Sequence, residues 1–365
     1  MEMKVHVIGA GIVGLTFAKE LAANGIRTTV YERKRDVEAG AEKASGILSI
    51  KGLEKSGIRY KNAIENTLNG AIIHVKNEEL LVEAKEPQAY IIDRRKLIRD
   101  AYEDAEEAGA LVLLGRNIDG NFLKELGNSD IIVGADGATS IVASTFGFPR
   151  MKEYILTYKA LYRNANIEDA NKVEIFFSDA TPGFFGWTAP HSDKLLELGV
   201  GVSSKAKKTS LQAFNAFTKN EKIKERIKWA TMENRFASII PLEVRKKSAK
   251  GNVALVGDAA GQVKASTGGG IIFGIACAKV LAETIIINRN SSGTGFLEEY
   301  EKKWRKLYGM DLMLHSIVHR YYSFIGIRNM KIMLKIAKFM GIEGFLSKHG
   351  DMDSPSLILK RIIKR

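Results

Sequence analysis

The stretch KVHVIGAGIVGLTFAKELAANGIRTTVYE, residues 4–32, decides the fold. An apolar run at residues 4–8 predicts a strand, and apolar residues at helical spacing over residues 12–24 predict a helix. A second β-rich run ends at Glu32. Strand, glycine turn, helix and strand form the βαβ unit of parallel sheets, so the sequence predicts an α/β fold.

Three glycines lie between the first strand and the helix, at Gly9, Gly11 and Gly14. The first permits a tight turn, the second lets a pyrophosphate approach the backbone, and the third allows close packing of helix and strand. The positive end of the helix then faces the phosphates. Glu32 can accept hydrogen bonds from ribose hydroxyls, and it would repel a 2′-phosphate, although Arg33 beside it weakens that argument. The pattern predicts a dinucleotide site.

Two later segments favour a flavin over a nicotinamide. Residues 257–261 (GDAAG) follow a strand at 252–257, and residues 267–271 (TGGGI) open an apolar helix that extends to Ile287. Asp258 could bind a ribityl hydroxyl, while backbone amides at the start of the helix could face the N1 and O2 edge of a flavin. The alternative is a pair of glycine caps without a ligand. We predict FAD as the cofactor.

The length of 365 residues suggests about two domains. Residues 71–76 and 79–84 read as a hairpin, and strand patterns over residues 155–203 precede two short helices near 209–229. This arrangement predicts a Rossmann-like FAD-binding domain interrupted by an α+β substrate domain with an antiparallel sheet, and then a helical C-terminus. The predicted boundaries are 1–70, 88–150 and 245–310 for the FAD-binding domain, 71–87 and 151–244 for the substrate domain, and 311–365 for a helical, basic C-terminal segment.

Four segments carry a resemblance to a known family. They are residues 254–283 (ALVGDAAGQVKASTGGGIIFGIACAKVLAE), Asp93-Arg94-x-x-Leu97, residues 134–140 (GADGATS) and residues 182–190 (PGFFGWTAP). Over roughly residues 3–310 the chain resembles the geranylgeranyl reductase family, which includes archaeal digeranylgeranylglycerophospholipid reductases. These are FAD enzymes with the p-hydroxybenzoate hydroxylase type of fold.

The resemblance, together with the glycine motifs, implies two sets of site residues. Arg94 is implied to reach the cofactor, and the aromatic segment near Trp187 is implied to contact the substrate, although aromatic strand residues are more often core. The predicted cofactor-binding residues are Gly9, Gly11, Val13, Gly14, Glu32, Arg33, Ala44, Ser45, Arg94, Ile118, Asp258, Gly269, Gly270 and Ile271. The predicted substrate-binding residues are Phe185, Trp187, Ala189 and Pro190.

The sequence departs from the family pattern at several of these positions. Ala44 stands where the family commonly has a cysteine beside the flavin, so a thiol cannot deliver a proton there. Phe185 replaces a tyrosine, Ala189 replaces a phenylalanine and enlarges the expected pocket, and Ala265 replaces a proline. No catalytic residue is predicted, and the proton source is unassigned.

The resemblance implies hydrogenation of isolated double bonds in isoprenoid chains, those of membrane ether lipids or their precursors. The single dinucleotide fingerprint indicates no bound NAD(P)H, so an electron-donor protein or another diffusible reductant is expected. An FAD-dependent monooxygenase or halogenase of the same fold is one alternative. A noncatalytic lipid or nucleic-acid binding protein on a flavin fold is another.

The basic charge gathers in the last part of the chain. The whole chain has a net charge of +13, and residues 302–365 contribute +10 of it, from 14 Lys and Arg against 4 Asp and Glu. Interleaved with apolar residues, these cations predict peripheral attachment to an anionic membrane surface. A solvated helical face is the alternative, and no nucleic acid is expected because no recognised binding motif accompanies the charge.

The remaining motifs argue against other chemistries. His315 and His319 have the i, i+4 spacing of zinc ligands, but no third ligand lies nearby, so no metal is expected. There is no G-x-S-x-G motif, and Cys277 lies in an apolar helix where an inert thiol is expected. One cysteine, no signal-peptide pattern and no long apolar run predict a cytoplasmic protein without a membrane-spanning helix.

Overall fold

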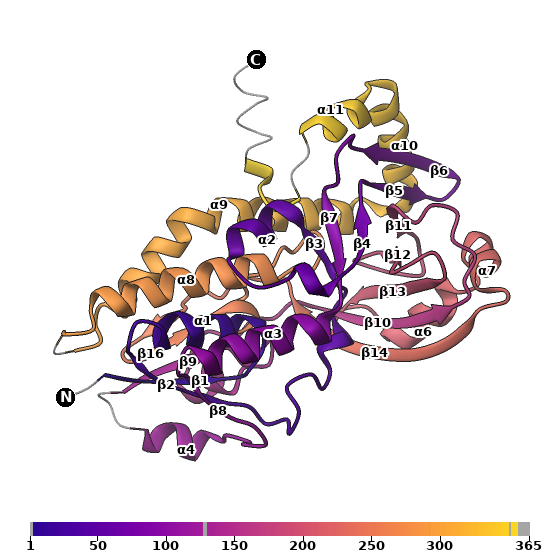
Figure 1. The fold of residues 1–365 in the computed structure, drawn as a ribbon. Helices are drawn as coiled ribbons and strands as arrows, with labels where there is room; N and C mark the ends of the chain where they lie inside the picture. The colour runs from indigo at the N-terminus through magenta and orange to yellow at the C-terminus, as the bar shows by residue number, and fades with distance from the viewer. Residues whose placement is uncertain (1–2, 127–129, 292, 350–351, 357–365) are drawn as a thin grey trace.

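A six-stranded sheet forms the first layer of the protein, as seen in a computed structural model that describes residues 3–126, 130–291, 293–349 and 352–356 (Figure 1). Its strand order is β15-β16-β9-β1-β2-β8, and every pairing is parallel except that of β15 with β16. The strands are β1 (Lys4–Ile8), β2 (Arg27–Tyr31), β8 (Leu111–Leu113), β9 (Ile131–Gly134), β15 (Ala249–Lys250) and β16 (Val253–Leu255). The predicted βαβ unit is confirmed.

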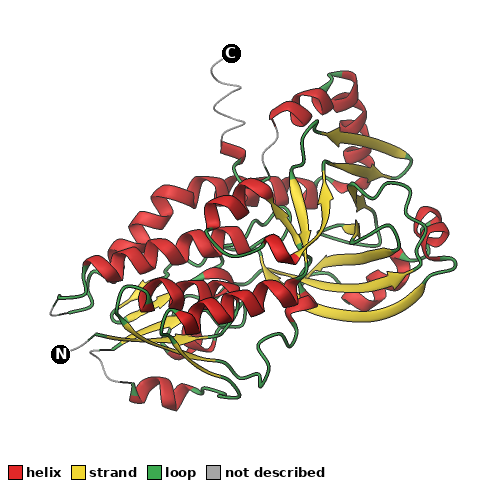
Figure 2. Ribbon diagram, viewed as in Figure 1, coloured by secondary structure: helices red, strands yellow, loops and turns green. Residues whose placement is uncertain are grey.

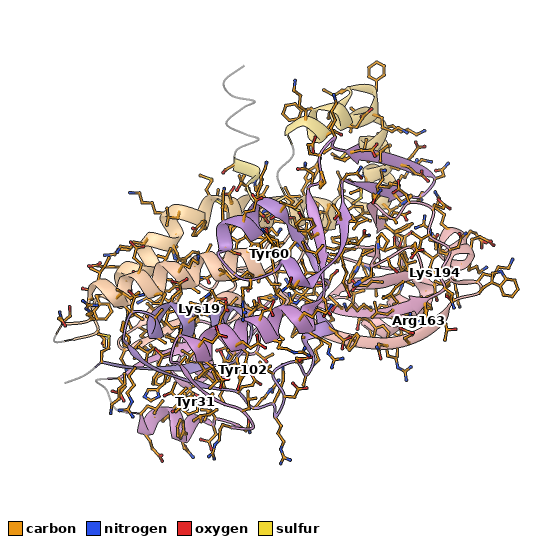
Figure 3. The ribbon with its side chains drawn as sticks, viewed as in Figure 1. Lys19, Tyr31, Tyr60, Tyr102, Arg163 and Lys194 are labelled. Atoms are coloured by element: carbon orange, nitrogen blue, oxygen red, sulfur yellow. The ribbon has the colours of Figure 1, made fainter. Side chains whose placement is uncertain are left out.

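Four helices share a core with this sheet: α1 (Ile12–Ala22), α3 (Arg94–Glu107), α8 (Ile271–Ile287) and α9 (Leu297–Phe324). Helix α1, on which Figure 3 labels Lys19, packs against both α3 and α8. An ion pair of 2.8 Å between Lys19 Nζ and Asp104 Oδ2 ties α1 to α3. The shorter elements of this layer are α4 (Gly120–Glu125), α5 (Ile141–Thr145) and a 3₁₀ turn, η3 (Gly257–Ala260).

A seven-stranded sheet forms the second layer, with the order β14-β10-β13-β12-β11-β5-β6 (Figure 2). It is antiparallel as predicted, except that β5 and β11 run parallel, which the long excursion of the chain between them permits. The hairpin predicted near residue 77 is confirmed and forms one edge of this sheet. Its strands are β5 (Gly70–Val75), β6 (Glu78–Glu83), β10 (Tyr154–Arg163), β11 (Lys172–Phe177), β12 (Gly186–Pro190), β13 (Leu195–Ser203) and β14 (Thr231–Pro241).

The two faces of the seven-stranded sheet have different coverings. One face packs on α6 (Ser210–Phe217) and α7 (Glu221–Ile227) through a cluster that includes Leu198, Val200 and Phe214. Side chains alternate along a strand, so Glu197 and Trp187 point to the opposite face. A three-stranded sheet, β3-β7-β4, and helix α2 complete this region. They are β3 (Ile47–Ser49), α2 (Ile50–Ser56), β4 (Ile64–Leu68) and β7 (Ala89–Ile92), with short 3₁₀ turns η1 (Ala41–Lys43) and η2 (Lys61–Ala63).

The chain after α9 is helical, as predicted, and then returns to the protein interior. Helix α10 (Gly326–Phe339) packs on β5 and β6 through Leu334, and α11 (Ile342–His349) lies beside β6 (Figure 1). Beyond it, Asp353 Oδ1 lies 2.6 Å from Lys264 Nζ, and Asp353 Oδ2 accepts a hydrogen bond from Ser49. Residues 357–365, part of the predicted basic segment, lie outside the described residues.

Candidate cofactor and substrate site

The first glycine loop has the geometry that a nucleotide phosphate requires. Gly9 has a φ of +105°, and a Cβ placed there would lie 2.5 Å from the carbonyl oxygen of Ala135. A Cβ on Gly14 would overlap the carbonyl oxygen of Gly9, whereas a Cβ on Gly11 would meet nothing within 4 Å. Packing therefore requires the first and third glycines, and the second faces open space into which a pyrophosphate fits.

Glu32 lies at the end of β2 with its carboxylate turned toward the glycine loop. Oε2 accepts a hydrogen bond of 3.0 Å from the N–H of Ala10, and Oε1 accepts one of 3.0 Å from the N–H of Lys34. Each oxygen keeps acceptor capacity, because a carboxylate offers about four lone-pair sites. The buried Glu32 can thus serve ribose hydroxyls, while Arg33 is exposed beside it.

The second glycine segment meets the first at Val13. Gly257 has a φ of +63°, and Cβ atoms built on Gly257 and Gly274 would lie 3.4 Å and 2.6 Å from the Val13 side chain. A Cβ on Gly270 would lie 2.7 Å from Asp258 Oδ1, and one on Gly269 would lie 2.8 Å from the side chain of Lys264. The beginning of α8, at Ile271, is therefore held close to the beginning of α1.

A buried hydrogen-bond chain fixes the turn that carries Asp258. Gln262 Oε1 accepts from the N–H of Gly257 at 2.8 Å, and Gln262 Nε2 donates to the hydroxyl of Tyr300 at 2.9 Å. The Tyr300 hydroxyl in turn donates to the carbonyl oxygen of Leu255 at 2.8 Å. Helix α9 thereby supports the turn that carries Asp258, a predicted cofactor-binding residue.

Arg94 and Asp258 form the charged part of this region. Burial raises the pKa of Asp258 to about 6, and the positive charge of Arg94 opposes that rise. Burial also lowers the pKa of Arg94 to about 10. Two guanidinium nitrogens of Arg94, Nε and Nη1, are buried without a hydrogen-bond partner among the described residues. Buried donors are almost always satisfied, so these nitrogens fit a phosphate or ribose group of a cofactor.

The loop before β3 contributes a further unsatisfied group. Ser45 Oγ is buried and has no hydrogen-bond partner within the described chain, and Gly46 packs directly on the carbonyl oxygen of Ile92. Ala44 is exposed, and its carbonyl oxygen accepts a hydrogen bond of 3.1 Å from Lys159 Nζ. Ile118 lies apart from this loop, half-buried against the apolar cluster that includes Ile8 and Leu123.

The predicted substrate residues lie on β12 and in the turn before it. Phe185 is buried and stacks on Phe184 with ring centroids 4.0 Å apart. The half-buried Trp187 donates its indole N–H to Glu197 Oε1 at 2.7 Å. Ala189 is fully buried, and the carbonyl oxygen of Pro190 accepts from Asn66 Nδ2 at 2.6 Å. These residues contribute to the core, and two of them, Trp187 and Ala189, also border the loop described above.

That border is an apolar cluster, which joins the two predicted sets of residues. Trp187 and Ala189 pack with side chains of the three-stranded sheet, including Ile47, which lies two positions after Ser45. Met352 from the end of the chain belongs to the same cluster. The predicted cofactor loop and the predicted substrate motif are therefore neighbours in space, although Ser45 and Trp187 are 142 positions apart in the sequence.

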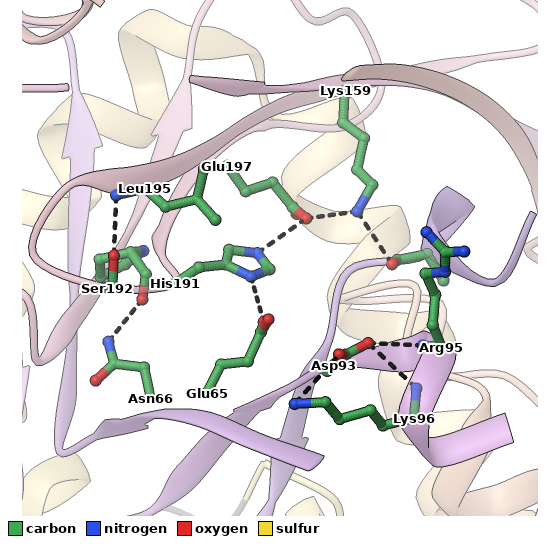
Figure 4. A network of polar contacts seen from close by, with 12 residues as sticks. Glu65, Asn66, Asp93, Arg95, Lys96, Lys159, His191, Ser192, Leu195 and Glu197 are labelled. Atoms are coloured by element: carbon green, nitrogen blue, oxygen red, sulfur yellow. Dashed lines mark hydrogen bonds and ion pairs between the residues drawn. The ribbon is translucent and has the colours of Figure 1, made fainter. Parts of the chain in front are cut away.

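Three ionisable residues next to this cluster escaped the sequence analysis: the buried Lys159 and Glu197 and the partly buried His191. Glu197 Oε2 lies 2.5 Å from Lys159 Nζ and 3.5 Å from His191 Nε2, as Figure 4 shows. The signal was present in the sequence, because a lysine and a glutamate interrupt the apolar strands YILTYKALYR and LLELGVGVS. A charge inside such a strand indicates a buried partner.

The histidines considered as zinc ligands have other partners. His315 Nδ1 lies 2.6 Å from Ser266 Oγ, and His319 Nε2 lies 3.0 Å from the carbonyl oxygen of Gly183. No group of three or more His, Cys, Asp or Glu within the described residues is arranged to hold a metal ion. Cys277 is buried in α8 as predicted, and burial raises the pKa of its thiol.

Comparison with known sequence families decides the cofactor. A family described as "FAD binding domain" matches residues 2–313. The chain belongs to this family. FAD is therefore its cofactor, in agreement with the open space at Gly11 and the unsatisfied donors of Arg94, and the protein is a flavin-dependent oxidoreductase as predicted.

Two archaeal relatives extend the resemblance. An uncharacterized protein of Methanocaldococcus jannaschii is 29% identical over 375 residues, covering 99% of this chain and 94% of its own length. The digeranylgeranylglycerophospholipid reductase of the same organism is 28% identical over 334 residues, covering 85% of this chain and 84% of its own. The resemblance to geranylgeranyl reductases is confirmed.

Solved structures share the fold. A geranylgeranyl bacteriochlorophyll reductase-like protein of Thermoplasma acidophilum aligns with a TM-score of 0.82 and 19% identity, covering 99% of this chain and 96% of its own. The flavin-dependent brominase Bmp2 aligns with a TM-score of 0.69 and 14% identity, covering 99% and 98% of the two chains. The predicted fold class is thereby confirmed. Within the described residues, no helix is long and apolar enough to cross a membrane.

Proposed function

We propose that this protein is an FAD-dependent reductase that hydrogenates isolated double bonds in geranylgeranyl or related isoprenoid chains, of membrane ether lipids or their precursors. The observation that carries the proposal is the apolar cluster in which Trp187 and Ala189 meet Ile47 beside the Ala44–Ser45 loop. An isoprenoid chain offers only apolar surface and double bonds, so apolar side chains next to the cofactor loop suit it. The reductases among the relatives support the same substrate class.

The residues of the chain have separate tasks in this proposal. Bound reduced FAD supplies hydride. Arg94 and the first glycine loop hold the phosphates, and Asp258 with the start of α8 positions the flavin end. Phe185, Trp187 and Ala189 line the substrate side and exclude water, which holds the alkene in a reactive orientation. Arg33 and Ile118 are proposed for the ribose and adenine side of the cofactor.

An electron-donor protein or another diffusible reductant is proposed to reduce the cofactor. The glycine fingerprint at Gly9–Gly14 is used for FAD, and the sequence contains no second one. Electrons therefore have to arrive from a transient partner. Photochemical or chemical reduction can replace that partner in a test.

The proposed cytoplasmic protein binds peripherally to an anionic membrane through α10 and the end of α9. Phe324 is 92% exposed and Phe339 is 93% exposed, and Ile332 and Ile336 on α10 are exposed as well. Leu334, on the other side of α10, is buried against β5 and β6, so the helix has apolar residues on two sides. Exposed lysines flank the outer side, which favours an anionic lipid surface.

Anaerobic turnover tests the proposed function. The purified protein is reduced chemically and incubated without oxygen with geranylgeranyl-bearing lipids and with free geranylgeranyl diphosphate. Mass analysis should show added hydrogen in the isoprenoid chain. Product that forms only with oxygen, carrying a hydroxyl or halide, would replace the proposal by the monooxygenase or halogenase alternative, for which the fold of the brominase is the supporting observation.

A further inference from the structure

The face of the seven-stranded sheet that carries Trp187 also carries the buried ion pair of Lys159 and Glu197. Together with His191 and Glu65, this pair forms a row of ionisable side chains that we call the ionic chain. In the register of β10 with β13, Lys159 pairs with Gly199, and Glu197 is two residues away on the same face. Trp187 pairs with Gly199 and Ala189 pairs with Glu197, so all four side chains share this face. Lys159 is 4% exposed and Glu197 is 0% exposed. The ionic pair therefore borders the proposed substrate residues directly.

These charged groups run from the buried Lys159 to the partly exposed Glu65, and Figure 4 shows the contacts between them. Lys159 Nζ lies 2.5 Å from Glu197 Oε2, which lies 3.5 Å from His191 Nε2. His191 Nδ1 lies 2.6 Å from Glu65 Oε2, and the Glu65 side chain is 32% exposed. At the inner end, the ammonium of Lys159 donates to the carbonyl oxygen of Ala44, in the loop proposed to border the flavin.

A purely structural role accounts poorly for this arrangement. Burying a lysine and a glutamate costs several kcal/mol per ion, and an apolar pair of similar volume is often as stable. The second oxygen of Glu197 is bound by the indole N–H of Trp187, so a proposed substrate residue shares the carboxylate with Lys159. The ionic chain thus links solvent, the substrate motif and the cofactor loop.

We infer that Lys159 donates the proton that alkene reduction requires, and that Glu197, His191 and Glu65 return a proton to it from solvent. This inference rests on the proposed function. One alkene carbon takes hydride supplied by the reduced cofactor, and the other takes a proton from the Lys159 ammonium, so two C–H bonds replace the π bond. Lys159 is left as a neutral amine. A proton then moves from His191 through Glu197 to Lys159, and His191 recovers one from solvent at Glu65.

The charges that face each member define its protonation. Lys159 faces Glu197 on β13, the Ala44 carbonyl and the Phe236 ring on β14, 5.8 Å away. His191 faces Glu65 on β4 and Glu197, and these two anions outweigh the effect of burial, raising the pKa of His191 to about 9. Lys159 and His191 hold the pKa of Glu197 below its usual range, against the effect of burial. His191 therefore holds a proton at neutral pH.

Lys159→Met tests the donor role, with Lys172→Met as the matched control. Lys172 is a half-buried lysine on β11 whose ion pairs, with Asp169 and Glu83, lie outside the ionic chain. Reduced holoenzyme is mixed with geranylgeranyl substrate, and single-turnover reoxidation of the flavin is followed. We expect Lys159→Met to slow this step at least about 100-fold with unchanged FAD content, and the control to stay within a few-fold of the parent.

A second measurement does not depend on turnover. The protonation of His191 is followed by NMR in holoenzyme with labelled histidine. Glu197→Gln should lower the pKa of His191, because it removes an anion and keeps the shape of the side chain. Lys159→Met should raise that pKa further, because it removes a competing cation.

The outcomes separate this inference from the proposed function. Slow reoxidation in Lys159→Met, together with both shifts at His191, would support the donor role. Reoxidation at the parental rate in Lys159→Met, or a His191 pKa that neither variant changes, would overturn it while the proposed function stands. A parent that reduces no isoprenoid would overturn both.

Discussion

Gly14 lies so close to Gly9 that a methyl group on Gly14 would overlap the carbonyl oxygen of Gly9. We therefore expect Gly14→Ala to destabilise the protein by about 1–3 kcal/mol, as overpacking of a close contact does. Chemical denaturation of parent and variant measures the difference. Unchanged stability would mean that α1 can shift away from the β1 loop at little cost.

Gly11 differs from Gly14, because a Cβ there meets no protein atom within 4 Å. Gly11→Val should leave the fold and the thermal midpoint of FAD-free protein near the parental values, and it should abolish FAD binding by occupying the space of the pyrophosphate. Absorbance of the purified variant measures bound flavin. Stoichiometric yellow cofactor in Gly11→Val would contradict the placement of the phosphates.

Asp258 should make FAD-free protein less stable as the pH rises from about 4 to 6. Its pKa in the folded state, about 6, lies above the unfolded value of 3.8, so the unfolded state loses its proton first. This contribution is fully present below pH 3.8 and is lost by about pH 6, on the order of 3 kcal/mol in all. Denaturation at several pH values should show that the free energy of unfolding of Asp258→Asn does not fall over this pH range. Parallel pH profiles for parent and variant would contradict the raised pKa.

Asp258→Ala should also weaken FAD binding. A hydrogen bond to a charged group contributes on the order of 1.5–3 kcal/mol, which corresponds to roughly 10-fold to 150-fold in affinity. Titration of stripped protein with FAD measures the change. A matched control is Asp119→Ala, which removes the cap of α4 away from the flavin segment and should leave the affinity unchanged.

Ala189 is fully buried in the apolar cluster that also holds Trp187 and Ile47, so two effects of Ala189→Phe are expected. The larger ring should restrict long isoprenoid substrates while FAD affinity stays constant. It should also reduce stability by about 1–3 kcal/mol through overpacking. Turnover of short and long prenyl substrates, measured beside the thermal midpoint, separates the two effects. Equal turnover of both chain lengths in parent and variant would place Ala189 away from the pocket.

Membrane binding should be sensitive to salt and to α10. The full chain should sediment with anionic vesicles and little with neutral ones, because each Lys or Arg near an anionic surface contributes about 1 kcal/mol. Added salt, removal of residues 354–365, or replacement of Phe324 and Phe339 by serine should each reduce binding. Leu211→Ser, at an exposed position on α6, is the control. Binding to both vesicle types that does not depend on salt, or binding to neither, would contradict electrostatic docking. Tight binding to duplex nucleic acid but not to vesicles would favour the nucleic-acid alternative.

The local patterns of the sequence were sufficient to predict the fold of the nucleotide-binding half. Spacing alone predicts the glycine loop of Gly9, Gly11 and Gly14, because the fingerprint lies within one βαβ unit. The hairpin around Asn77 was predictable for the same reason. The close approach of Ala135 to Gly9 was not predictable in this way, because Ala135 follows a strand more than a hundred residues later. Nor was the parallel pairing of β5 with β11, since it joins segments about a hundred residues apart.

The ionic chain could not be assembled from sequence, although its members could be suspected. Lys159 and Glu197 interrupt apolar strands, but only the register of β10 with β13 shows that they share a face with Trp187. His191 joins them through a turn, and Glu65 joins from a different sheet. Such constellations depend on tertiary pairing, which periodicity does not encode.

The contact of Asp353 with Ser49 and Lys264 has a consequence for biosynthesis. Ser49 precedes Asp353 by 304 residues and Lys264 precedes it by 89. At a synthesis rate of about 5–20 residues per second, Ser49 exists for roughly 15–60 s, and Lys264 for roughly 4–18 s, before Asp353 is made. During translation the loop before α8 therefore carries a lysine without this carboxylate. The interior between that loop and β3 acquires this ionic contact only after both flanking layers have been synthesised.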